Sequence, residues 1–219
     1  MRTAGWLSIS FLCWCLAATA GAADFSRNIS SLIAPEKLAT LGPRGANPRI
    51  QKAVAQLEAA RASGLKVEKV AAEAVALAGY RNAAAKLTAD ALVRNHDIAA
   101  KLGCLDAAGL AQMRRGKSPT VQKGPYKGQE LSVDHIIPRA VVPELDNVIA
   151  NLELLPLRLN ESKNAKIGDR QISYAQKLHQ AGLLSADGLK KVQNGKAKPS
   201  TARSSDRPNV SHLSLRVAI

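Results

Sequence analysis

Apolar residues recur at helical spacing along the first half of the chain. They fall three or four positions apart in three successive runs: Ile50, Val54, Leu57 and Ala60, then Val67, Val70, Ala74 and Leu77, then Leu87, Ala91, Arg94 (through its aliphatic stem) and Ile98. This spacing places the apolar side chains of each run on one face of a helix. Gly64 and Gly79 separate the runs. With one more short helix before Arg114, the pattern predicts an alanine-rich helical region over residues 49–113, packed as a small bundle or arm.

The segments that flank the patterned part of the chain have a different composition. Residues 24–48 contain the helix breakers Pro35, Gly42, Pro43, Gly45 and Pro48. Because proline and glycine interrupt long elements, we predict a linker there. Residues 194–219 consist mainly of Lys, Ser, Pro, Arg and Asn. This composition cannot bury enough apolar surface to offset the ordering entropy, so we predict a disordered basic tail.

Beyond residue 130 the apolar residues form short runs that favour strands. The first run holds Leu131, Val133, Ile136 and Ile137, and the second covers residues 151–155. Pro138 and Pro143 mark a loop between them. Asn160 then has the side chain of a helix cap, and a further helix is predicted over residues 171–181. The pattern therefore predicts a module over residues 119–182 and an α+β fold class for the chain.

The first 22 residues have the features of an export signal. Arg2 precedes a mostly apolar run over residues 6–18, which is too short to span a bilayer as a mature anchor. Ala20, Gly21 and Ala22 form a small-x-small cleavage site. We therefore predict a signal peptide over residues 1–22, a periplasmic or secreted protein, and no stable membrane anchor after cleavage. An uncleaved membrane-anchoring N-terminus is the alternative.

The charge of the chain favours a polyanionic partner. The 31 Lys and Arg residues against 17 Asp and Glu residues give a net charge of +14 and a pI near 10.1. Such an excess points first to nucleic acid and second to an anionic envelope surface. A dense basic segment precedes the strand module and consists of Arg114, Arg115, Lys117, Lys123 and Lys127. We expect it to follow a nucleic-acid backbone without reading bases.

One histidine lies beside a carboxylate at the end of the first apolar run. The chain has four histidines, and His135 directly follows Asp134. A carboxylate and an amide oxygen can share a hard cation, and a neighbouring imidazole can take a proton from water. Asn160 supplies a candidate amide oxygen. These residues outline a site for metal-assisted hydrolysis of a phosphodiester.

Three motifs occur in a fixed order: Asp134-His135-Ile136-Ile137-Pro138, Asn151-Leu152-Glu153-Leu154-Leu155 and Asn160-Glu161-Ser162-Lys163. In this order they resemble the HNH nuclease family, in its variant with asparagine as the last metal-site residue. The resemblance covers roughly residues 124–170 and implies a ββα-metal module. It implies that Asp134 and Asn160 hold a divalent cation, Mg²⁺ or Mn²⁺ by preference for oxygen donors. It also implies that His135 is the general base and that Asn151 orients it.

Together with the predicted export signal and the basic segment, the resemblance implies an exported, metal-dependent HNH endonuclease that hydrolyses phosphodiester bonds in DNA, or in RNA, with low sequence specificity. Arg139 and Lys163 are further candidates for contacting phosphate. Each site residue also has a structural alternative, since His135 and Asn151 suit turns and Asn160 suits a helix cap. The alternative functions are a non-catalytic basic protein that binds nucleic acid or the envelope, and an antibacterial toxin domain. No protein partner can be inferred.

Overall fold

The computed structural model describes residues 24–163 and 166–195. Residues 24–33 are helical. The helices that follow are α2 (Pro35–Leu38), α3 (Asn47–Ala62), α4 (Val67–Leu77), α5 (Asn82–Lys101) and α6 (Ala107–Arg114). The second half holds β1 (Leu131–His135), the 3₁₀ turns η1 (Pro143–Leu145) and η2 (Ile149–Asn151), β2 (Leu152–Pro156), α7 (Leu157–Lys163), α8 (Asp169–Gln180) and α9 (Ala186–Asn194). The predicted signal peptide and residues 196–219 of the predicted tail lie outside the described residues.

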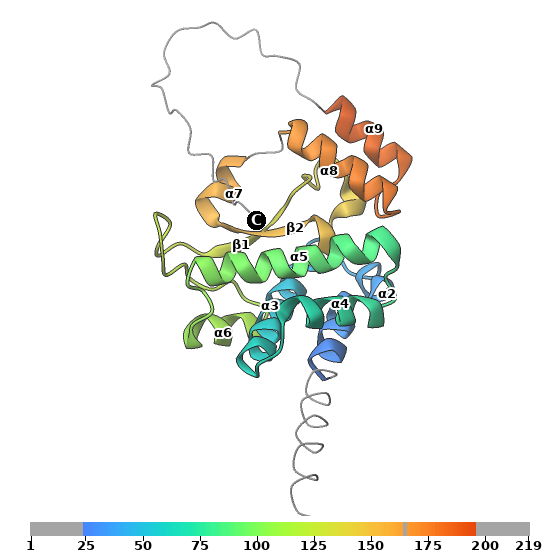
Figure 1. Ribbon diagram of the computed structural model, residues 1–219. Coiled ribbons are helices and arrows are strands. Elements are labelled where there is room, and N and C mark those ends of the chain that lie inside the picture. The colour runs from blue at the N-terminus through green and yellow to red at the C-terminus, as the bar shows by residue number, and fades with distance from the viewer. Residues whose placement is uncertain (1–23, 164–165, 196–219) are drawn as a thin grey trace, which may run out of the picture.

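A two-stranded antiparallel sheet lies between two groups of helices (Figure 1). Helices α2 to α6 lie on one side of it, and α7 and α8 lie on the other. In the register of the two strands Asp134 is opposite Glu153 and His135 is opposite Leu152. The mixed composition, mostly helical with a small sheet, agrees with the predicted α+β class.

The three predicted helical runs form α3, α4 and α5. Their buried stripes include Ile50, Leu57, Val70 and Leu92 in one core cluster. Leu77 is an exception, because the pattern placed it on a buried stripe and it is 58% exposed. It is the last residue of α4, where the helix ends before the chain turns at Gly79.

The prediction of a linker over residues 24–48 is wrong. This segment holds the helical residues 24–33 and α2. Ile29, Ile33 and Leu38 are buried in the same core cluster as α3 and α4. Phe25, Ile29 and Ile33 recur four residues apart, which is helical spacing, and the first breaker comes only at Pro35. Asn194, the first residue of the predicted tail, is likewise the last residue of α9.

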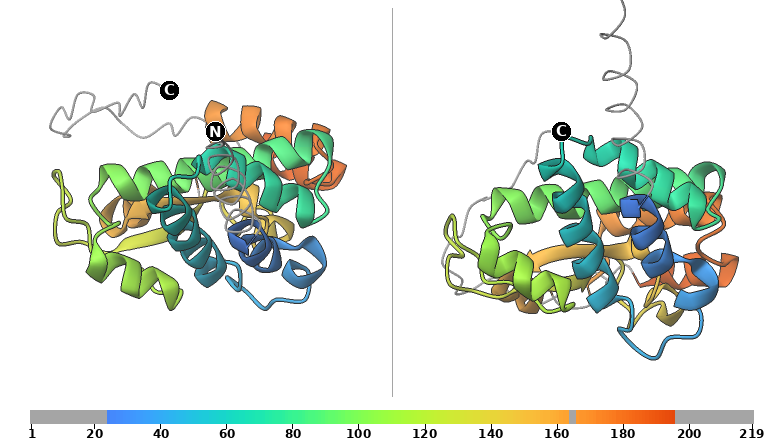
Figure 2. Two further views of the ribbon diagram at one scale, coloured as in Figure 1. Left: turned by 60° about the horizontal axis from the view of Figure 1, so that its bottom comes forward. Right: turned by 90° about the horizontal axis from the view of Figure 1, so that it is seen from below.

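The sheet is joined to the helical region by polar side chains of α5. Asn95 Nδ2 donates to Leu152 O at 3.0 Å, and Asn95 Oδ1 accepts from Leu154 N at 2.7 Å. Arg94 Nη2 donates to Leu152 O at 3.2 Å. These contacts give hydrogen-bond partners to the backbone groups on the edge of β2 that does not face β1. The side chain of Asn95 therefore takes the place of part of a third strand. Helix α5 runs alongside the sheet in Figure 1 and in the two views of Figure 2.

We predict that Asn95→Ala lowers the free energy of unfolding by about 1–3 kcal/mol, because the buried Leu154 N–H loses its partner, while Leu152 O keeps its hydrogen bond from Arg94 Nη2. Urea unfolding followed by circular dichroism measures this. The exposed Asn28→Ala is the control and should stay within about 0.5 kcal/mol of the unmodified protein. A loss for Asn95→Ala no larger than that of the control would contradict the proposed role of the amide.

Candidate active site

The predicted metal residues lie on facing elements, β1 and α7. Asp134 Oδ2 is 2.5 Å from Lys163 Nζ, and Asn160 Nδ2 donates to Ser132 Oγ at 3.0 Å. Ser132 and Asp134 are two residues apart in β1, so their side chains lie on the same face of the strand. Asn160 and Lys163 lie one turn apart on α7. The four side chains therefore form two neighbouring cross-links between strand and helix. The structure thus brings Asp134 and Asn160 to one strand–helix boundary.

Asn160 is not a helix cap. Helix α7 begins at Leu157, directly after Pro156 ends β2, so Asn160 is the fourth of its seven residues. The prediction placed Asn160 at the start of this helix because asparagine is a favoured helix cap. No loop is present, since Leu157 N continues the strand pairing by donating to Glu130 O at 2.9 Å. The amide of Asn160 therefore faces β1.

Glu153 is a second carboxylate at this boundary, and sequence reasoning missed it. It lies opposite Asp134 in the strand register and is 5% exposed. Arg170 Nη2 is 3.1 Å from Glu153 Oε2, and Lys163 Nζ is 4.0 Å from Glu153 Oε1. Lys163 Nζ also donates to His135 O at 2.8 Å. An acidic residue inside an apolar strand was the available signal, because burying an unpaired carboxylate is costly.

The side chain of His135 is nearly buried, at 7% exposure, and its orientation is defined. Nε2 is 2.9 Å from the backbone carbonyl oxygen of Asp146. A carbonyl oxygen only accepts, so Nε2 carries the hydrogen, and the neutral ring keeps its lone pair on Nδ1. None of the described residues is a hydrogen-bond partner of Nδ1. Nδ1 is therefore the nitrogen that can accept a proton.

Asp146 is a further residue that sequence reasoning missed. Its Oδ1 is 2.9 Å from His135 Nε2, where it can stabilise a protonated ring without adding a second hydrogen bond. Its Oδ2 accepts from Arg44 N at 3.1 Å and is 3.6 Å from Arg139 Nη1. Because Asp146 follows His135 by eleven residues within a loop, no periodicity in the sequence marked it.

Asn151 ties the loop between the strands. It is fully buried, its Oδ1 accepts from Ile137 N at 2.9 Å, and its Nδ2 donates to Ile137 O at 3.0 Å and Leu145 O at 3.3 Å. These partners follow His135 in the chain and precede Asp146. The amide therefore holds together the two ends of the loop that leads from His135 to its partner Asp146, without touching His135 itself.

The predicted phosphate-binding residues divide into two groups. Arg114, Arg115, Lys117, Lys123 and Lys127 lie in the segment from the end of α6 to the turns before β1. That segment joins the Leu131 end of β1, where Leu131 N donates to Pro119 O at 2.8 Å. Asp134 lies three residues further on, roughly 10 Å along the strand. The other group, Arg139 and Lys163, lies at the site and is held by Asp146 and Asp134.

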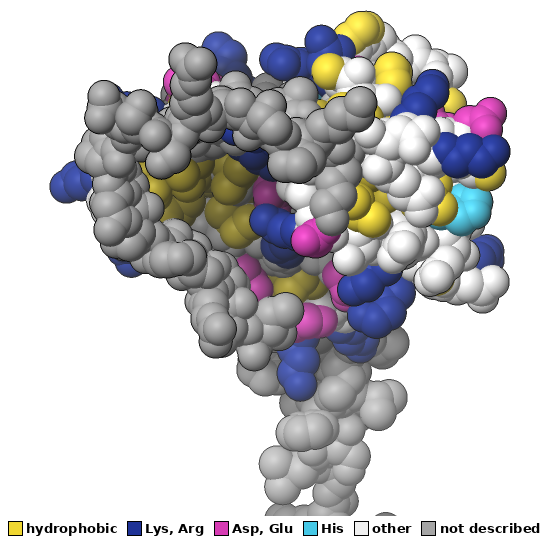
Figure 3. Space-filling view, turned by 90° about the horizontal axis from the view of Figure 1, so that it is seen from above, with side chains coloured by type: hydrophobic (Ala, Val, Ile, Leu, Met, Phe, Trp, Pro, Cys, Tyr) yellow, Lys and Arg dark blue, Asp and Glu magenta, His cyan; other side chains and the backbone are white. Residues whose placement is uncertain are grey.

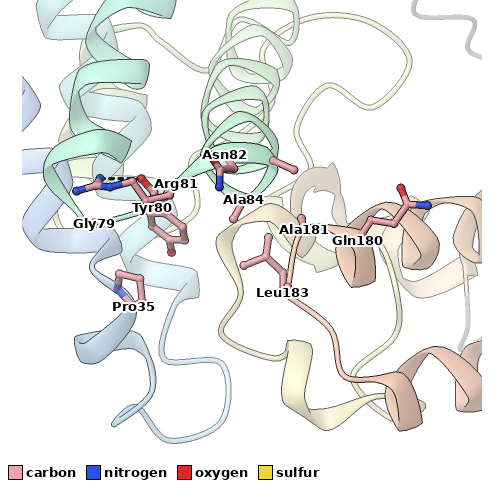
Figure 4. A pocket seen from close by; sticks show the side chains of 11 residues that line it. Pro35, Gly79, Tyr80, Arg81, Asn82, Ala84, Gln180, Ala181 and Leu183 are labelled. Atoms are coloured by element: carbon pink, nitrogen blue, oxygen red, sulfur yellow. Dashed lines mark hydrogen bonds between the residues drawn. The ribbon is translucent and has the colours of Figure 1, made fainter.

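Two cavities in the described part of the chain bear on the site. The larger, about 550 Å³, lies at the start of α5 beside Tyr80, Arg81 and Leu183 (Figure 4). Tyr80 OH donates to Ile33 O and Arg81 Nη1 donates to Ala76 O, so these polar groups already have structural partners. None of the predicted site residues lines this cavity. The smaller, about 240 Å³, lies between α5 and α8 beside Ile136.

The oxygen atoms around Lys163 suit a cation. The ammonium group is near a carboxylate oxygen of Asp134, a carboxylate oxygen of Glu153 and the carbonyl of His135. Hard oxygen donors of this kind also suit Mg²⁺ or Mn²⁺. A divalent cation on Asp134 would have to replace the ammonium. Among the described residues no group of three or more His, Cys, Asp or Glu side chains is arranged for a metal ion.

No protein-family model, curated protein or solved structure matches this chain. Within residues 24–163 and 166–195, no helix has both the length and the apolar composition needed to cross a membrane.

The geometry of His135 leads to a prediction about its tautomer. In the neutral ring, ¹⁵N nuclear magnetic resonance of histidine-labelled protein should show the hydrogen of His135 on Nε2, because the Asp146 carbonyl requires a donor there. His135→Gln identifies the resonance by removing it. A hydrogen found on Nδ1 would contradict the assignment of Nδ1 as the proton acceptor.

Proposed function

We propose that the protein is an exported, metal-dependent HNH-type endonuclease that hydrolyses phosphodiester bonds in DNA, or in RNA, with low sequence specificity. The single observation that carries the proposal is the imidazole of His135. Its Nε2 is held by Asp146, and its Nδ1 has no hydrogen-bond partner among residues 24–163 and 166–195. The residue before it, Asp134, faces the helix that carries Asn160. The basic charge of the chain supports a nucleic-acid substrate.

In this proposal Nδ1 of His135 accepts a proton from a water molecule, and the hydroxide attacks the phosphorus in line with the leaving oxygen. The Asp146 carboxylate stabilises the resulting imidazolium, and its carbonyl keeps the ring oriented. Asn151 supports both residues by holding the ends of their loop. A bound divalent cation supplies stabilisation of the charge that grows on the phosphate and leaving oxygens.

Asp134 and Asn160 would hold that cation, with the rest of its coordination shell left to water and substrate. Lys163 would then leave Asp134 Oδ2. A released ammonium one helical turn from Asn160 lies close enough to contact the substrate phosphate, which is the role predicted for Lys163 from the sequence. In this proposal the charge of the Asp134 carboxylate is therefore balanced by Lys163 in the metal-free protein and by the cation when metal is bound.

A specific observation also favours the second candidate, a non-catalytic basic protein that binds nucleic acid. The ammonium of Lys163 is 2.5 Å from Asp134 Oδ2 and could neutralise this carboxylate permanently. In that case the strand–helix boundary would be a structural ion pair, and the charge of +14 would serve binding alone.

The two candidates differ in a plasmid-nicking assay. We predict that the protein cuts plasmid DNA with Mg²⁺ or Mn²⁺ and that EDTA abolishes the cutting. His135→Ala should lower turnover by roughly 10²- to 10⁴-fold, the usual effect of losing a general base. His179→Ala is the matched control, since His179 lies on α8 and its Nδ1 is hydrogen-bonded to the nearby Leu184 O. Cutting in EDTA, or full turnover by a folded His135→Ala protein, would rule out this mechanism.

The proposed replacement of the Lys163 ammonium by a metal ion on Asp134 predicts how Lys163→Met changes metal binding. Removing the competing ammonium should tighten Mn²⁺ binding at least about tenfold, equivalent to 1.4 kcal/mol, measured by titration calorimetry without nucleic acid. The control Lys166→Met removes a nearby exposed charge that has no partner among the described residues, and it should change the affinity far less. Asp134→Ala should abolish binding. Equal Mn²⁺ affinity in the Lys163→Met and unmodified proteins would mean that lysine and metal do not compete.

A further inference from the structure

We propose that the cavity of about 240 Å³ between α5 and α8 is a second substrate site, which binds a backbone phosphate next to the one that is cut. The inference rests on the proposed function, because it assigns a neighbouring phosphate of the same substrate. The cavity was not among the sites expected from the sequence, and its basic residues come from helices on both sides of the sheet.

The lining of this cavity has the chemistry of an anion site. Its residues are three cations, two hydroxyl side chains and one apolar side chain: Arg94, Arg170, Lys177, Ser173, Tyr174 and Ile136. No carboxylate lines it. Burial raises the pKa of Tyr174, so its phenol stays neutral and adds no negative charge. The cavity, about 240 Å³, has room for one phosphate group.

Two of the three cations lack a counter-charge within the described part of the chain. Arg170 is paired with Glu153, but Arg94 and Lys177 form no ion pair with any described residue. Arg94 Nη2 donates to the carbonyls of Ala150 and Leu152, while its Nε is buried without a hydrogen-bond partner. Leaving a charged donor buried and unpaired is unfavourable. An anion in the cavity would offset the positive charge that Arg94 and Lys177 bring to its lining.

The cavity is placed correctly for the next phosphates along one nucleic-acid strand. Ile136 follows Asp134 by two residues, and two residues of strand span roughly 7 Å. A duplex carries one phosphate per about 3.4 Å of axis on each strand. The cavity therefore suits a phosphate one or two nucleotides from the one at Asp134.

A second basic region lies at the other end of β1. The segment that carries Arg114 to Lys127 joins the Leu131 end of the strand, whereas the cavity borders Ile136. The site at Asp134 lies between them, so a nucleic-acid strand following β1 would meet positive charge on both sides of the cut. Seen from the side of α7 and α8, Lys and Arg side chains occur across the face around a few acidic side chains (Figure 3).

The test measures binding of the full chain to a labelled 20-base-pair duplex in EDTA, by fluorescence anisotropy over a range of salt concentrations. We expect Lys177→Gln to reduce the slope of log affinity against log salt by about 0.9, the value for one phosphate contact. If the two proteins bind equally at 1 M salt, this slope change makes the affinity of Lys177→Gln about eightfold weaker than that of the unmodified protein at 0.1 M salt. Lys177→Glu should reduce the affinity further, and the losses should be equal on two unrelated duplexes.

Lys66→Gln is the matched control, because Lys66 is an exposed lysine at the start of α4, in the helical layer on the other side of the sheet. If Lys177→Gln and Lys66→Gln have the same slope, the cavity does not bind a backbone phosphate. A loss confined to one of the two duplex sequences would also overturn the inference, because it would mean base reading. Equal competition by millimolar inorganic phosphate against the unmodified and Lys177→Gln proteins would do so as well.

The outcomes separate this inference from the proposed nuclease activity. If the unmodified protein cuts DNA and Lys177→Gln keeps the full salt slope, the phosphate site is wrong and the nuclease proposal stands. If the protein binds DNA with the expected loss for Lys177→Gln but never cuts it, the phosphate site stands and the nuclease proposal is wrong.

Discussion

The amide of Asn95 is the contact on which the arrangement of this protein depends. A two-stranded sheet by itself is marginally stable in water, because it has two open edges and little apolar surface to bury. Asn95 supplies a donor and an acceptor to the open edge of β2, where the backbone of a third strand would otherwise supply them. Helix α5 thereby joins the sheet to the helical region, and the apolar core extends from Ile29 through Leu92 to Leu152 without a break.

The helical region also positions the candidate active site. The loop before α3 contacts the loop that carries Asp146, since Arg44 N donates to Asp146 Oδ2 and Ala46 N donates to Asn147 Oδ1. Asn147 Nδ2 returns a hydrogen bond to Leu41 O. Asp146 is therefore held by residues about a hundred positions earlier in the chain. This arrangement gives the N-terminal segment a physical role, which is to keep the partner of His135 in place.

Charge balance shapes the boundary between β1 and α7. Two carboxylates that lie opposite each other on neighbouring strands repel each other, and burial strengthens the repulsion. Lys163 and Arg170 offset it at Asp134 and Glu153. In the proposed enzyme the balance would change when a divalent cation replaced Lys163, while Arg170 continued to neutralise Glu153. The same arginine also lines the cavity between α5 and α8, so the metal and phosphate sites would share one network of charges.

The spacing of apolar residues by itself determined the helices α3, α4 and α5 and the two strands, because periodicity records which face of each element is buried. The order of the motifs around Asp134, Asn151 and Asn160 also marked the candidate site. The sequence could not reveal Asp146 as the partner of His135, Glu153 opposite Asp134, or the pairing of Lys163 with Asp134. These contacts depend on strand register, loop path and the docking of one helix. Only the tertiary structure decides them, since their partners are brought together by packing and not by spacing along the chain.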